Sequence, residues 1–106
     1  MRVLFGQGTP VPLRKHLSTH QVSTAYEFGW ATLQNGELLE QAESAGFEVF
    51  ITTDKNIKYQ QDLSNRLIKI VVLSSASWPR IQRVIPDILV VVESIEPSGY
   101  VEITVP

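Results

Sequence analysis

Residues 49–56 constrain the fold of this chain more than any other stretch. Val49-Phe50-Ile51 combines β-branched and aromatic side chains with no polar position, the pattern of a strand buried on both faces. Such strands belong to parallel sheets covered by helices. The apolar run ends near Asp54, so this carboxylate is expected beyond the carboxyl end of a strand, where open parallel sheets bind ligands. Asp54 as a simple cap of the next helix is the structural alternative.

Further strands are predicted by β-branched or alternating apolar residues. Residues 67–73 form an almost uniformly apolar, β-branched run, which indicates a strand at or near the centre of the sheet. Tyr100 begins an alternating segment that is typical of an edge strand with one solvated face. The predicted strands are 3–5, 21–24, 49–51, 67–73 and 100–105.

Helices are predicted between these strands from apolar residues three and four positions apart. Asn35 is expected as the N-cap of the second helix and Gly46 as its C′ glycine. Ser77 is expected to cap the last helix, and Pro86 predicts a kink there or two abutting helices. The predicted helices are 12–17, 36–45, 57–63 and 78–92, with turns at 65–66 and 97–99. This order predicts one α/β domain over residues 1–106, a three-layer sandwich with a mostly parallel sheet of about five strands.

Composition excludes several classes of protein. With 106 residues, 43% apolar and 19% charged, the chain matches an ordinary single globular domain. The absence of cysteine excludes disulfides, zinc-thiolate sites and thiol catalysis, and a cytoplasmic protein is expected. A net charge of -2 argues against a surface that is basic throughout. No signal peptide or membrane helix is expected, because no apolar run is long enough.

Two carboxylates are expected to converge at one edge of the sheet. Residues 6–8 and Asp54 follow strands, and Glu37 opens a helix on the same side. Carboxylate oxygens at such an edge suit Mg²⁺ or Mn²⁺ together with a substrate phosphate. The implied reaction is metal-assisted attack of water on a phosphodiester.

Three pieces of the chain resemble the small, single-domain PIN-like family. Leu4-Phe5-Gly6-Gln7-Gly8-Thr9-Pro10 is similar to the family's opening Leu-Leu-Asp-Glu-Asn-Leu-Pro type motif. Asn35-Gly36-Glu37-Leu38-Leu39 matches its acidic helix start, and Thr52-Thr53-Asp54-Lys55-Asn56-Ile57 its Thr-Arg-Asp-Lys-Asp-Phe segment. The resemblance implies a PIN-like sandwich and, in active members, Mg²⁺-dependent ribonuclease activity. It also implies frequent service as the toxin of a toxin-antitoxin pair.

The chain departs from the family pattern at three acidic positions. Gly6 stands at the first catalytic aspartate, Gln7 at the neighbouring acid and Asn56 at the second acid of the Asp-Lys-Asp piece. Only Glu37 and Asp54 carry over as acids and are the predicted metal ligands. A set of two carboxylates holds a hard cation less well than a set of three or four.

The predicted site therefore combines acidic, neutral and basic side chains. Glu37, Asp54 and Asn56 are the candidate catalytic residues. The candidates for substrate binding are the neutral Gln7 and the basic residues Arg14 and Lys55, which are expected around the acidic edge. The alternative for the two basic residues is that they are solvated surface charges.

Two functions stay open. The first is a Mg²⁺-dependent ribonuclease-type domain with an incomplete acidic site, in the toxin role that the resemblance implies. The second is a catalytically degenerate PIN-like module that binds RNA or a protein partner such as an antitoxin.

Other conspicuous residues favour structural roles. His16 and His20 have the spacing of a zinc pair on a helix, but the helix is expected to end near Ser18. Trp30 and Trp78 are expected to be aromatic residues of the core or of an interface, rather than residues that stack on bases. A homodimer built on the apolar helix 78–92 is a third, structural alternative.

Overall fold

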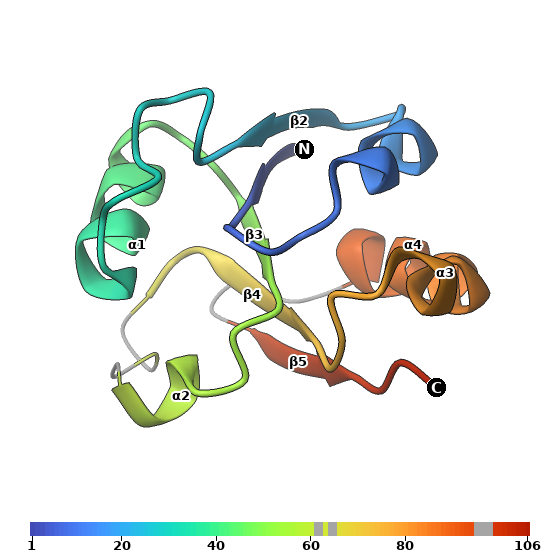
Figure 1. Cartoon of the computed structure of the whole chain (residues 1–106). Helices are drawn as coiled ribbons and strands as arrows, with labels where there is room; N and C mark the ends of the chain where they lie inside the picture. The colour runs from blue at the N-terminus through green and yellow to red at the C-terminus, as the bar shows by residue number, and fades with distance from the viewer. Residues whose placement is uncertain (61–62, 64–65, 95–98) are drawn as a thin grey trace.

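The computed structural model shows a parallel sheet between two layers of helices (Figure 1). It describes residues 1–60, 63, 66–94 and 99–106. Within these residues the five strands are β1 (Arg2–Phe5), β2 (Gln21–Thr24), β3 (Val49–Thr52), β4 (Lys69–Leu73) and β5 (Tyr100–Ile103). Every neighbouring pair runs parallel, in the order β2-β1-β3-β4-β5. The predicted α/β sandwich with a mostly parallel sheet is confirmed.

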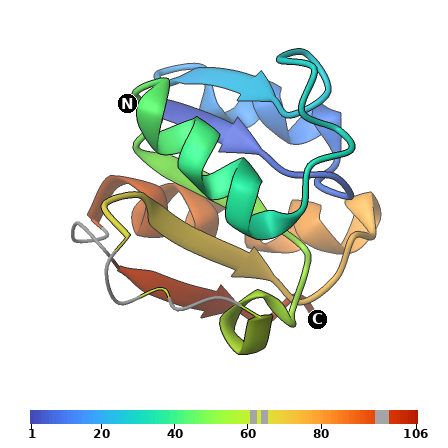
Figure 2. The same cartoon turned by 90° about the vertical axis from the view of Figure 1, so that its left-hand side faces the viewer.

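The strand order fixes where a ligand site is expected. The chain steps outward from β1 to β2, then crosses back to β3 on the other side of β1 and continues to β4 and β5. The direction of winding therefore reverses between β1 and β3, and doubly wound sheets bind ligands at the carboxyl ends of the two strands at such a point. Figure 2 shows the strand arrows pointing toward one common end of the sheet, which we call the carboxyl rim.

Two helix layers cover the two faces of the sheet (Figures 1 and 2). One face packs against η1 (Val11–Leu17), α3 (Trp78–Ile81), η2 (Gln82–Val84) and α4 (Ile85–Ser94), and the other against α1 (Asn35–Ser44) and α2 (Ile57–Gln60). Alternate strand residues supply the two cores: Val49 and Ile51 belong to the first, and Phe50 between them to the second. All of β3 is buried, as its apolar run predicted.

Most predicted elements are present, with corrected boundaries. Asn35 is not the N-cap of α1 but its first residue, and Gln34 holds the cap position. Gly46 is the expected glycine after the helix, with a φ of 87°. β4 begins at Lys69 because the N–H groups of Leu67 and Ile68 donate to the Glu43 carboxylate instead of to a neighbouring strand. Residues 12–17 belong to a 3-10 helix, which still buries Leu13 and Leu17.

The last helical region confirms the effect of proline. Ser77 is the N-cap of α3, although its side chain makes no capping bond. Pro86 is the second residue of α4, which abuts the short helices α3 and η2, so the predicted interruption is present. The predicted edge strand is β5. Residues 61–62 of the predicted helix 57–63, and 65 and 97–98 of the predicted turns, lie outside the described residues.

Candidate functional site

The segment after β1 is bonded directly to β3. The Gly6 N–H donates to the Ile51 carbonyl at 2.9 Å, and the Thr9 hydroxyl donates to the same oxygen at 3.0 Å. The Thr9 N–H donates to the Gly6 carbonyl at 3.2 Å and closes a β-turn over residues 6–9. Gly8, with a φ of 85°, supplies the left-handed conformation in this turn. The loop therefore lies against the strand that leads to Asp54.

Two glycines of this loop leave no room for side chains toward β3. A Cβ on Gly6 would lie 2.8 Å from Cζ and 3.0 Å from Cε1 of Phe50, a side chain that is 1% exposed. A Cβ on Gly8 would lie 2.7 Å from the Thr53 hydroxyl oxygen. Both distances are below ordinary van der Waals contact. The loop after β1 is thus packed closely against Phe50 and Thr53 at the point of reversal between β1 and β3.

Asp54 forms a structural junction at the carboxyl rim. Its Oδ1 accepts the Asn56 backbone N–H at 2.9 Å, and its Oδ2 accepts the Asn35 side-chain amide at 2.8 Å. Its own N–H donates to the Thr52 hydroxyl at 3.1 Å. These bonds fit the structural alternative for Asp54, a carboxylate that organises the turn into α2. They also bring the first residue of α1 to the end of β3.

The other predicted catalytic residues lie on the surface near this junction. Glu37 is in the first turn of α1, two residues beyond Asn35, and its side chain is exposed. Lys55 and Asn56 follow Asp54 directly and are exposed as well. α1 therefore starts at the same end of the sheet as Asp54.

These residues fit Mg²⁺ or Mn²⁺ poorly. Both oxygens of Asp54 already accept bonds from the protein, and Phe50 fills the space next to Gly6 where a further acid would project. Among the described residues, no group of three or more His, Cys, Asp or Glu side chains is arranged to hold a metal ion. A hard cation needs oxygen ligands with enough negative charge to offset its dehydration.

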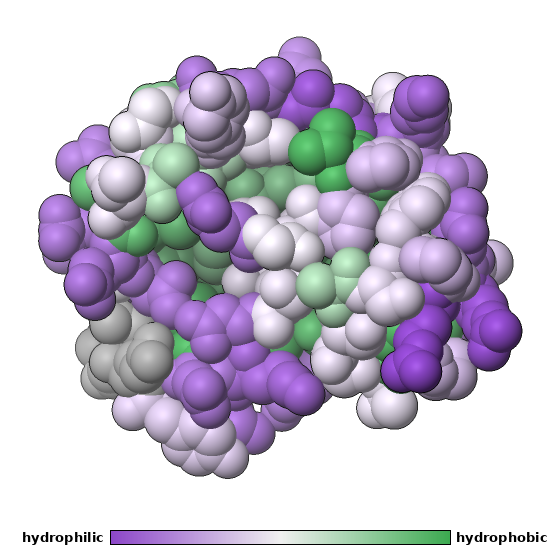
Figure 3. All heavy atoms as spheres, in the orientation of Figure 1, coloured by the Kyte–Doolittle hydropathy of each residue, from purple (hydrophilic) through white to green (hydrophobic). Residues whose placement is uncertain are grey.

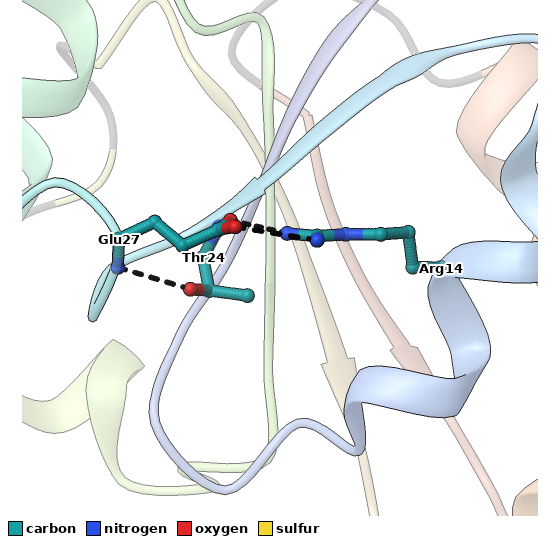
Figure 4. A network of polar contacts seen from close by, with 3 residues as sticks. All are labelled: Arg14, Thr24 and Glu27. Carbon is teal, nitrogen blue, oxygen red and sulfur yellow. Dashed lines mark hydrogen bonds and ion pairs between the residues drawn. The ribbon is translucent and has the colours of Figure 1, made fainter.

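Arg14 is held in an ion pair on the other side of β1 (Figure 4). Its guanidinium group makes two bonds to the Glu27 carboxylate, one of them at 3.3 Å. Glu27 also accepts the Thr24 N–H at 2.8 Å, and the Glu27 N–H donates to the Thr24 hydroxyl at 3.1 Å. The bond from Arg14, followed by that from Thr24, holds the pKa of Glu27 below its ordinary value. The predicted phosphate contact of Arg14 thus competes with an existing pair.

A hollow opens beside this network, between the end of β2 and the segment that follows β1 (Figure 3). Its volume is about 270 Å³, and its walls are residues 5–9, residues 24–26 and Val11. We call it the rim hollow. Gln7 lies in its wall, with its amide donating to the Ala31 carbonyl at 3.0 Å. Tyr26 and Val11 are 78% and 55% exposed at its edge.

The sequence reasoning missed the rim hollow and Tyr26. The available signal was the spacing Thr24-x-x-Glu27, the S/T-x-x-E pattern in which side chain and backbone bond each other reciprocally. That pattern predicts a fixed turn after β2, and the turn places Tyr26 next to the loop after β1. Backbone bonds from Phe28 to Ala25 and from Gly29 to Tyr26 complete it.

The remaining candidates have structural partners. His20 contacts the amino terminus at 3.3 Å and Glu93 at 3.5 Å, while the His16 ring packs 5.7 Å from that of Trp78. Trp30 packs on Phe28 and Phe47, which supports its assignment as a core aromatic. Trp78 packs against the other core.

Comparison with known proteins gives no further assignment. No protein-family model matches the sequence, and no curated protein or solved structure is significantly similar to it. Among the described residues, none of the helices combines the length and the apolar character needed to span a bilayer. The site must therefore be interpreted from its own geometry.

Proposed function

We propose that this chain is a PIN-like domain that binds single-stranded RNA without cleaving it. The absence of cleavage is supported by the close packing of Gly6 against Phe50. A Cβ at this position would lie 2.8 Å from the Phe50 ring, so an acid here would force that buried ring to shift. The degenerate module is thus favoured over the Mg²⁺-dependent ribonuclease.

Binding of RNA is supported by the resemblance in three segments and by the surface around the rim hollow. Tyr26 presents an exposed aromatic side chain, which is the kind of group that stacks on unpaired bases. Two cations that could otherwise bind phosphates already have acidic partners: Arg14 is paired with Glu27, and Lys58 with Glu102 at 2.9 Å. We therefore expect binding through bases, with a shallow dependence on salt.

The proposal is tested by incubating short, end-labelled single-stranded RNAs with the protein in the presence of Mg²⁺ or Mn²⁺. We expect a rise in fluorescence anisotropy on binding, full-length RNA after incubation, and no metal-linked gain in melting temperature. An RNA that leaves anisotropy unchanged at every concentration would overturn the binding half.

Matched variants decide the catalytic half. The ribonuclease would be established instead if Asp54→Asn and Glu37→Gln abolished cleavage and Glu40→Gln did not. Glu40 is the control because it is also exposed on α1. The motivating observation for that candidate is the bond between Asn35 and Asp54, which brings the start of α1 to the end of β3. Cleavage that is equal in all variants would identify a contaminating nuclease and leave the proposal intact.

A further inference from the structure

We propose that the rim hollow binds a single nucleobase, with its ring stacked on Tyr26. This inference deepens the proposed function, because it names the part of the RNA that is recognised and the place where it binds. The same chemistry is offered by a free nucleoside and by an unpaired base in RNA, and the experiment below distinguishes these two sources.

The size of the hollow points to one ring system. At about 270 Å³ it lies just below the range of about 300–1,000 Å³ that holds drug-sized ligands, so a dinucleotide would not be enclosed. It opens to the surface between β2 and the loop after β1, as Figure 3 shows, so a base attached to a chain can enter from outside.

The lining selects a neutral and flat ligand. Among the described residues that form its walls, none has a charged side chain, so a phosphate would find no counter-charge inside. Its exposed apolar residues are Val11 and Tyr26, while Phe5 is buried beneath the lining. Tyr26 and Val11 stand at the edge, where an aromatic ring can be covered by the phenol and contacted by the methyl groups.

Two polar side chains in the wall can read the edge of a base. The Gln7 amide nitrogen donates to Ala31, which leaves its carbonyl oxygen as an acceptor. The Thr24 hydroxyl accepts the Glu27 N–H and can still donate its own hydrogen. One acceptor and one donor match the mixed edges of nucleobases, and Glu27, paired with Arg14, fixes Thr24 by accepting its N–H.

The site is tested with adenosine, uridine and inorganic phosphate as separate probes, followed in ¹H–¹⁵N NMR spectra of the whole chain. We expect a nucleoside to shift the amides of residues 6–9 and 24–26, and phosphate to leave them unchanged. Shifts confined to other residues, or identical shifts with phosphate, would overturn the inference.

Substitutions at exposed positions locate the contact without disturbing the core. Tyr26→Ala should weaken nucleoside binding about tenfold, and Tyr26→Phe should retain most of it. Val11→Trp should block the hollow. Tyr59→Ala is the matched control, since Tyr59 is 77% exposed on α2 and does not line the hollow. An equal loss of affinity in Tyr59→Ala would contradict the assignment.

The RNA arm separates this inference from the proposed function. RNA binding that survives both Tyr26→Ala and Val11→Trp would overturn the nucleobase site and leave the RNA-binding function standing. A nucleoside that binds at the hollow while single-stranded RNA does not would support the site, identify the free nucleoside as its ligand, and overturn the RNA-binding function.

Discussion

The two sides of β1 differ sharply at the carboxyl rim. Toward β3 the loop is closely packed, because Gly6 lies against Phe50 and Gly8 against Thr53. Toward β2, the surface opens into a hollow of about 270 Å³ edged by Tyr26. The difference shows that strand order fixes where a site is expected, whereas individual side chains decide whether that place is open.

The amino end of the sheet gives a second contrast. A hollow of about 310 Å³ lies there, and charged side chains stand in its wall, including Glu43, Glu48 and Lys69. Glu43 is committed to structure, because it accepts bonds from Arg66 and from the backbone at the entry to β4. Glu43 thus serves the fold at this end of the sheet, whereas no described residue in the walls of the rim hollow has a charged side chain.

The largest loss of stability is expected from placing an acid at Gly6, on the side of β1 that faces β3. Gly6→Asp should lower the free energy of unfolding by about 3–5 kcal/mol, because the new side chain would collide with the buried Phe50 ring and place a carboxylate at a buried position. Urea denaturation measures this loss. An unchanged midpoint would show that position 6 is open and would restore the predicted acidic site.

A smaller loss is expected where the loop approaches β3 at Gly8. Gly8→Ala should cost about 2 kcal/mol, because it combines a positive φ with a contact of 2.7 Å to Thr53. Gly29→Ala is the control: its φ is also positive, at 75°, but nothing lies within 4 Å of its Cβ, so a cost of about 1 kcal/mol is expected. Equal losses in thermal unfolding would argue against close packing at Gly8.

Removing the Asp54 carboxylate tests whether this residue is structural. Asp54→Ala should cost about 1.5 kcal/mol, because the Asn35 amide and the Asn56 N–H lose their acceptor. Glu37→Ala, at an exposed position, should change stability by less than about 0.5 kcal/mol. A neutral Asp54→Ala in the same denaturation assay would mean that the carboxylate is free to serve a ligand.

The pH dependence of stability probes the charged end of the sheet. Burial acts to raise the pKa of Glu43, but bonds from Arg66, Leu67 and Ile68 outweigh it and lower that pKa. A carboxyl group whose pKa is lower in the folded state adds stability at pH values above its ordinary pKa. This added stability is lost as the pH falls through the folded pKa. We expect Glu43 to contribute about 1 kcal/mol at neutral pH.

Comparing the wild-type protein with Glu43→Gln between pH 7 and pH 3 isolates this contribution. The variant should lose less stability on acidification, whereas Glu40→Gln, at an exposed position on the same helix, should follow the wild-type curve. Identical slopes for all three proteins would contradict a structural role for the Glu43 charge.

The sequence predicted the fold much better than the site. Uniformly apolar runs such as 49–51 and helical spacing around Leu38 and Leu39 report burial directly, so the layers and most elements followed from them. The partners of Asp54 and Arg14 could not be predicted, because Asn35 and Glu27 are distant from them in the sequence and come close only when the chain is folded. The close approach of Gly6 to Phe50 likewise depends on the register of β1 and β3.

The interlock between Gly6 and Phe50 is tested most directly by a double-mutant cycle of Gly6→Ala and Phe50→Leu in urea denaturation. Each single variant should be less stable than the wild type, the first through overpacking and the second through a lost ring. We expect the double variant to lose about 1 kcal/mol less than the two single losses added together, because the smaller side chain makes room for the new methyl group. Losses that simply add would contradict it.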